Sequence, residues 1–145
     1  MFYPSKKFVE TLSDAERFIF LKVICGMVAS DRRVSKNEIS YLKELALQFG
    51  VSADTITVMV KSSDTKALLK QARMITDRNK ALALIKDLCV VANKDIELED
   101  KEIDYILDVA EVLGVDPIRV KDINVVVSSY LDCEKNMKKL LELED

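Results

Sequence analysis

The sequence contains no histidine and no tryptophan, and its 145 residues include only three glycines and two prolines. Because all-β folds need many turn residues, this scarcity favours helices. The absence of histidine excludes acid–base catalysis and nucleophile activation by an imidazole. Three isolated glycines cannot form a glycine-rich phosphate-binding loop. Two large groups of enzyme sites are therefore excluded before any motif is considered.

Long apolar runs and clusters of one charge are also missing. The longest apolar run, FIFLKVICGMVA, is broken by Lys22 and is shorter than the roughly 20 residues that span a bilayer. The start of the chain has no apolar region typical of a signal peptide. The three cysteines, Cys25, Cys89 and Cys133, are far apart and odd in number, which is typical of reduced thiols. We therefore expect a cytoplasmic protein with no direct membrane insertion.

The charge balance argues against nucleic-acid binding. The net charge is −3, and acidic and basic residues are mixed along the chain. A nucleic-acid interface normally needs lysines and arginines gathered on one face. Apolar residues make up 49% of the chain, which is enough for one domain with a hydrophobic core.

The chain repeats itself at an offset of 64 residues. Residues 22–51 align without a gap with residues 86–115. The identical pairs are Lys22/Lys86, Cys25/Cys89, Asp31/Asp95, Glu38/Glu102, Ile39/Ile103, Tyr41/Tyr105, Ala46/Ala110, Gly50/Gly114 and Val51/Val115. We interpret this repeat as a duplicated helix–loop–helix unit, with copies at about 15–51 and 79–115 in a single domain of residues 1–145.

Capping signals and helical periodicity predict an all-α fold of about seven helices. Two Ser-x-x-Glu capping boxes stand at 13–16 and 35–38. Gly50 and Gly114 stand where a helix ends in a left-handed residue. The predicted helices cover about 14–29, 36–49, from 52 or 54 to 60, 65–74, from 76 or 77 to 92, 100–113 and about 117–140. The β-prone stretch NVVVSSY lies inside the last of these, and its context predicts helix.

Equivalent residues of the two copies are expected in the core or at its edge. The stripe of Phe18, Leu21, Cys25 and Val28 has helical spacing, and Leu82, Ile85, Cys89 and Ala92 repeat it. Core packing is therefore preferred for both cysteines over a disulfide or a soft-metal pair. Tyr41 and Tyr105 lie off the stripe, so we expect them at the edge of the core with the hydroxyl outward. Contact with a partner is the alternative for these tyrosines.

The strongest candidate for a binding site is the stretch KDIELEDKE, residues 94–102, which holds five carboxylates in nine positions. One interpretation is a Ca²⁺ or Mg²⁺ site, because hard cations prefer several oxygen ligands. The candidate ligands are Asp31, Glu38, Asp95, Glu97, Glu99 and Glu102. A second interpretation is a solvated helix start, where the helix dipole stabilises each acid by about 0.3–1 kcal/mol. A third is a set of ion pairs in which Arg32 and Arg33 face Glu97 and Glu99.

The repeated motif supports a family resemblance. In each copy an Asp is followed by an aliphatic residue, a Glu in the first turn of the next helix, and a Gly at its end. The matching positions are Asp31, Val34, Glu38 and Gly50 in one copy, and Asp95, Leu98, Glu102 and Gly114 in the other. Over roughly residues 15–117 the chain resembles the TerB-like family, which is associated with bacterial tellurite resistance. This sequence has Arg32 and Ile96 where the family pattern has Gly.

The resemblance implies a function as well as a helical fold. It implies a non-catalytic module in a metal, tellurite or envelope stress response, acting as a divalent-cation-responsive or protein-interaction domain. Its partners would be other proteins of a stress-response complex. The alternative is a metal-dependent hydrolase that uses the carboxylates of the acidic loop. The sequence predicts no oligomeric state.

Overall fold

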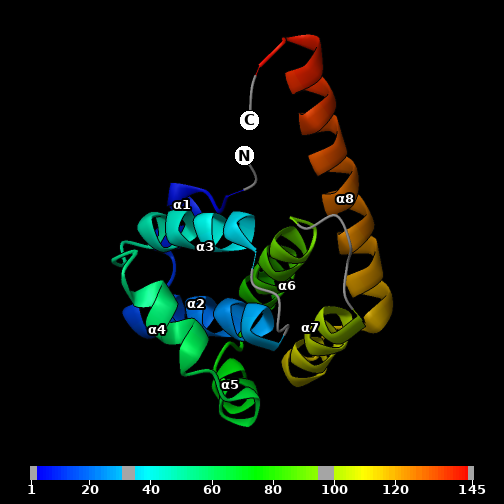
Figure 1. Cartoon of the computed structure of the whole chain (residues 1–145). Helices are drawn as coiled ribbons and strands as arrows, with labels where there is room; N and C mark the ends of the chain where they lie inside the picture. Colours follow the sequence, from blue (N-terminus) through cyan, green and yellow to red (C-terminus); the bar gives the residue numbers. More distant parts are fainter. Residues whose placement is uncertain (1–2, 31–34, 95–99, 144–145) are drawn as a thin grey trace.

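The computed structural model describes residues 3–30, 35–94 and 100–143, and within these ranges it is built from helices without strands (Figure 1). The helices are α1 (Lys6–Glu10), α2 (Asp14–Ser30), α3 (Lys36–Gln48), α4 (Thr55–Lys61), α5 (Thr65–Ala72), α6 (Arg78–Ala92), α7 (Asp100–Leu113) and α8 (Pro117–Leu140). The predicted all-α fold of about seven helices is confirmed. The β-prone stretch at 124–130 lies inside α8 and is helical, as predicted.

The helix starts follow the local capping signals. The Glu16 amide donates to Ser13 Oγ (3.1 Å), and the Ser13 amide donates to Glu16 Oε1 (2.9 Å). Ser35 and Glu38 form the same reciprocal pair at the start of α3. These bonds satisfy amide groups that a helix leaves unpaired in its first turn. The capping boxes therefore begin α2 and α3 where the sequence places them.

The ends of α3 and α7 have the same geometry. Gly50 and Gly114 both have a φ of +73°, in the left-handed region that glycine adopts without steric cost. The Val51 amide donates to the Ala46 carbonyl (2.9 Å), and the Val115 amide donates to the Ala110 carbonyl (2.8 Å). This is the hydrogen bond of a Schellman motif, repeated at equivalent positions of the two copies.

The first helix, α1, was not predicted. It has only five residues, so it shows no periodic stripe. Its one signal is Ser5, whose Oγ accepts a hydrogen bond from the Phe8 amide (3.1 Å). Burial of Val9 against the core holds the helix in place.

The central element of the core is α2, which packs against α3, α4, α5, α6 and α7. Its buried residues are Ile19, Phe20, Leu21, Val23, Ile24, Cys25, Gly26, Met27 and Val28. A helix that is apolar on every side needs neighbours all round. Cys25 and Cys89 are buried free thiols, so the prediction of core packing is confirmed. Phe18 was predicted in the core but is 43% exposed, because it lies near the start of α2, beyond its most enclosed part.

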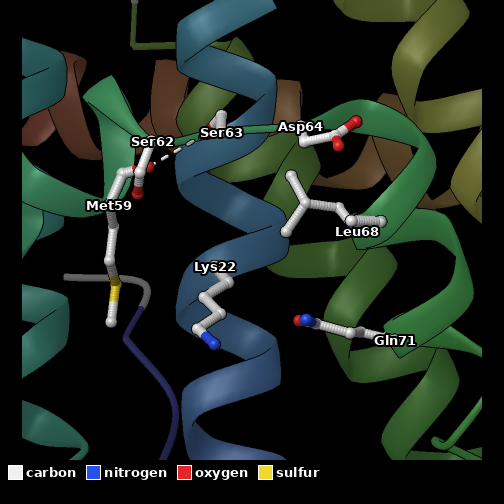
Figure 2. A pocket seen from close by; sticks show the side chains of 8 residues that line it. Lys22, Met59, Ser62, Ser63, Asp64, Leu68 and Gln71 are labelled. Carbon is white, nitrogen blue, oxygen red and sulfur yellow. Dashed lines mark hydrogen bonds between the residues drawn. The ribbon is translucent and has the colours of Figure 1, made fainter.

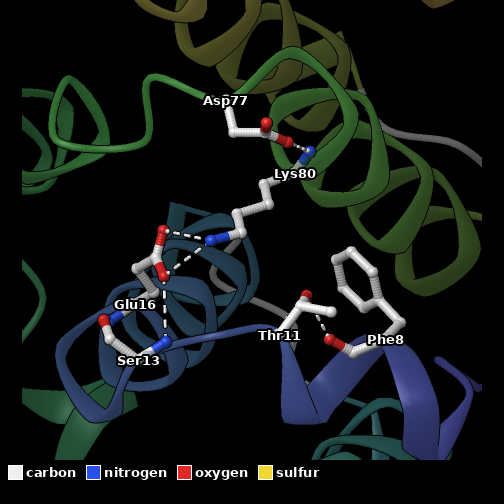
Figure 3. A network of polar contacts seen from close by, with 6 residues as sticks. All are labelled: Phe8, Thr11, Ser13, Glu16, Asp77 and Lys80. Carbon is white, nitrogen blue, oxygen red and sulfur yellow. Dashed lines mark hydrogen bonds and ion pairs between the residues drawn. The ribbon is translucent and has the colours of Figure 1, made fainter.

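The two copies meet at a pair of equivalent side chains. Lys80 Nζ lies 3.0 Å from Glu16 Oε1 and 3.2 Å from Oε2, and these residues are 64 positions apart (Figure 3). The same Glu16 carboxylate belongs to the capping box of Ser13, so one acid caps α2 and joins it to α6. The offset between the partners is the offset of the sequence repeat.

The last helix, α8, is only partly packed. Its first half lies against α6 and α7, and its last turns extend beyond the other helices (Figure 1). The buried residues of α8 are Val120, Val127 and Leu131, and none lies beyond Leu131. Although α8 has 24 residues, no helix among those described is long and apolar enough to cross a membrane.

Candidate functional site

Two of the six predicted cation ligands lie in the described part of the chain. Glu38 and Glu102 are both inaccessible to solvent, in the first turns of α3 and α7. The remaining candidates, Asp31, Asp95, Glu97 and Glu99, lie outside the described residues, as do Arg32 and Arg33. Within the ranges that are described, no three Cys, Asp or Glu side chains gather closely enough to hold a metal ion. The Ca²⁺ or Mg²⁺ site therefore stays a prediction.

The buried face of α7 begins with an acid. Glu102, Tyr105, Ile106, Val109 and Ala110 are all buried and follow the spacing of one helix face. Ile103 lies off this face and is more exposed than Tyr105. The prediction of outward tyrosine hydroxyls was wrong, because it took the isoleucine, rather than the glutamate, as the start of the buried stripe.

The hydroxyl of Tyr105 makes a buried bond to the central helix. Its oxygen donates to the backbone carbonyl of Val23 at 2.7 Å. Burial raises the pKa of this phenol. Gly26 allows the close approach, since a Cβ at this position would collide with Leu68 and with the Tyr105 hydroxyl. The tyrosine thus fastens α7 to α2.

The second copy differs from the first at the position of Val23. The equivalent residue is Asp87, which is fully buried in α6 and paired with the neighbouring Lys86. Burial raises the pKa of Asp87 to about 6, while the Lys86 charge acts in the opposite direction. Burial also raises the pKa of Tyr41, and the charge of Asp87 adds to this effect. Because Asp87 has no exposed surface, a substrate cannot reach it in this conformation, and the fold does not offer it as a catalytic acid.

A cavity of about 140 Å³ lies among α2, α4 and α5. Figure 2 shows Lys22 of α2 between Met59 of α4 and Gln71 of α5. The Ser63 hydroxyl donates to the Met59 carbonyl at 3.0 Å on one side of this cavity. Ligand pockets usually measure about 300–1,000 Å³, so this cavity suits water rather than a cofactor.

A second cavity, of about 300 Å³, lies where α3, the end of α6 and the second half of α8 come together. Tyr3 stacks on Tyr41, with ring centroids 5.0 Å apart, and Lys94 Nζ lies 4.9 Å from the Tyr41 centroid. Glu134, Lys135 and Lys138 complete the charged lining. Burial lowers the pKa of Lys94. Three ammonium groups beside one carboxylate and two phenols do not select a single class of ligand.

The last helix carries an apolar stripe, which we call the α8 stripe; it is partly buried at Ile123 and exposed from Val126 onward. It consists of Ile123, Val126, Tyr130, Cys133, Met137 and Leu140. These positions alternate at intervals of three and four residues, the spacing of the contact positions in a coiled coil. Val126, Met137 and Leu140 are 63%, 54% and 79% exposed. The α8 stripe lies beside the face that packs on α6, so α8 has two apolar faces, and Val126, Met137 and Leu140 on the second are largely exposed.

A groove of about 510 Å³ lies next to the first half of the α8 stripe. Leu82 and Ala83 of α6 form one wall, and Ile123, Val126 and Val127 of α8 form the other. Its polar residues are Asn79, Lys86, Arg119 and Asp122. The groove and the stripe form one continuous apolar surface, because Ile123 and Val126 belong to both.

Comparison of the chain with protein-family models, with curated proteins and with solved structures finds no match. The resemblance to the TerB-like family therefore stays a prediction from the repeated motif.

Proposed function

We propose that this protein is a non-catalytic protein-interaction module whose contact surface is the α8 stripe with its adjoining groove. The observation that carries the proposal is the exposure of Val126, Met137 and Leu140 on one helix face. Fully covering an aliphatic side chain contributes about 1.5–3 kcal/mol, so a fold that leaves a row of them uncovered forgoes that stabilisation. Apolar patches of this kind mark interaction sites.

The occupant that fits this surface is an amphipathic helix of another chain. From Ile123 to Leu140 the stripe is about 26 Å long at a rise of 1.5 Å per residue. Side chains spaced at three and four residues leave holes that accept side chains of a helix with the same spacing. Such recognition is a common mode of helix-in-groove binding. The resemblance to the TerB-like family supports a module of this non-catalytic class, with partners in a stress-response complex.

Photo-crosslinking in cells that produce the full chain tests the proposal. A crosslinking amino acid replaces Met137, and in a matched control it replaces Lys121, which is exposed on the same helix but off the α8 stripe. The expected result is a covalent adduct with another polypeptide at position 137 and none at position 121. Val126→Asp in the same chain should reduce the adduct. Equal labelling at both positions, or none at either, would contradict the proposal.

A further inference from the structure

The α8 stripe and its adjoining groove have features that favour one particular helix as the occupant. We infer that the occupant is a second copy of this chain, bound antiparallel, so that the second half of α8 from each copy fills the groove between α6 and α8 of the other. This inference rests on the proposed function, since it names the partner of the same surface.

The α8 stripe is complementary to itself in the antiparallel direction. In one register Ile123 faces Leu140, Val126 faces Met137, and Tyr130 faces Cys133 of the second copy. The residue numbers of the three pairs have the same sum, as a two-fold axis between residues 131 and 132 requires. All six residues of the stripe are used, and each pair occurs twice. An interface with this symmetry closes on itself as a dimer.

The groove provides the reason for the antiparallel direction. It lies beside the first half of α8, where Leu82 and Ala83 of α6 are exposed to it. The cavity beside the second half of α8 is lined by the charged residues Glu134, Lys135 and Lys138. The exposed apolar side chains of this half and its C-cap are Met137, Leu140 and Leu141. Antiparallel pairing brings these side chains into the groove of the other copy. Parallel pairing would place the two second halves together and leave both grooves open.

The exposed area is close to what a dimer needs. Large side chains bury on the order of 150–200 Å² when they are fully covered. From their exposed fractions, Val126, Tyr130, Met137, Leu140 and Leu141 together offer roughly 500 Å² per copy. The groove walls and the stems of neighbouring charged residues bring the total toward the roughly 800 Å² per partner of a standard interface. We therefore expect a dimer with a dissociation constant in the micromolar range.

Sedimentation velocity of the full chain from 1 to 200 µM tests the association. Wild type is expected to pass from monomer to dimer across this range. Val126→Asp should weaken dimerisation at least tenfold, because the charge is buried twice in a two-fold interface. The matched control is Val125→Asp, since Val125 is 55% exposed but points away from the stripe. It should leave the association unchanged, and circular dichroism should show equal helix content in all three proteins.

Disulfide trapping tests the direction. Val126→Cys and Met137→Cys are made separately, each with Cys133→Ser. A mixture of the two variants should form a covalent heterodimer on mild oxidation, because these positions face each other only in the antiparallel register. Each variant alone should remain without a disulfide. Homodimers of each single variant, with no heterodimer in the mixture, would overturn the antiparallel arrangement.

The outcomes separate this inference from the proposed function. A chain that stays monomeric at 200 µM but crosslinks through position 137 to a different protein overturns the second copy and leaves the proposed function in place. A monomeric chain with no adduct overturns both. Stripe-dependent co-sedimentation of a monomeric chain with vesicles of anionic phospholipid also overturns both, because the surface would then bind lipid.

Discussion

The buried carboxylate of Asp87 makes the stability of this fold depend on pH. Asp87 lies in α6 where the first copy has Val23, and it has no exposed surface. Burial raises its pKa from 3.8 to about 6, although the charge of Lys86 opposes the change. The folded protein therefore holds this proton more tightly than the unfolded chain does. Stability from this group is full below about pH 4 and is lost as the pH rises toward 6.

The size of the effect follows from the two pKa values. A change from 3.8 to about 6 is equivalent to about 3 kcal/mol, at about 1.4 kcal/mol for each pH unit. With a urea dependence of about 1–3 kcal/mol per molar for a domain of this size, the midpoint of unfolding moves by about 1–3 M. This is a large part of the roughly 5–15 kcal/mol that stabilises a typical domain.

The assay compares wild type with Asp87→Asn by urea unfolding, followed by circular dichroism, from pH 4 to pH 8. Other carboxylates titrate in both proteins, so they cancel in the difference between the two free energies of unfolding. Relative to wild type, the variant should gain about 2.5 kcal/mol between pH 4 and pH 7 and almost nothing further above pH 7. Two stability curves that stay parallel over this range would refute the argument that Asp87 is buried with its charge poorly compensated.

Three further predictions concern the contacts of the core and the acidic segment. Gly26→Ala should destabilise the fold by about 1–3 kcal/mol in thermal unfolding, because the added methyl group collides with Leu68 and Tyr105; a wild-type melting temperature would contradict the close approach. Tyr105→Phe should cost about 1 kcal/mol in urea unfolding, since the Val23 carbonyl loses its buried donor; no loss would mean that the hydroxyl bond contributes nothing. The hypothesis of a divalent-cation site predicts heat in calorimetric titration with millimolar Ca²⁺ or Mg²⁺ and less heat in Glu97→Gln. If the wild-type protein gave no heat of binding, both the cation-responsive role and the metal-dependent hydrolase would be excluded.

The helix bounds were predictable because their signals are local. Ser35 caps α3 through a bond to the amide three residues later, and Gly50 ends the same helix by taking a φ of +73°. Neither feature depends on a distant part of the chain. The one missed helix, α1, has a cap at Ser5 but is too short for periodicity. Burial of Cys25 and Cys89 was predicted for the related reason that a stripe of apolar residues at helical spacing needs a covering partner.

The surroundings of the candidate site residues were less predictable, since the spacing of polar residues does not show whether they face the core or the solvent. Glu38 closes a capping box as predicted, but the complete burial of Glu38 and Glu102 was not predicted. The tyrosine hydroxyls were expected outside, and Tyr105 donates to the core backbone instead. For the tyrosines the misleading assumption was that a hydroxylated side chain marks the exposed face of its helix.

The local sequence determines where each helix begins and ends, how it is capped, and that α2 is apolar. Hydrogen bonds and residue spacing within one or two helical turns are sufficient to decide these features. Which of two apolar faces on α8 is covered is a different kind of question. Both faces have helical spacing. The packing of α8 on α6 and α7 buries Val120 and Val127 and leaves Val126, Met137 and Leu140 in solvent. The interior of the domain can cover only some of the apolar faces of its helices. Which faces are covered therefore depends on how all the helices pack together, and the local sequence does not determine it.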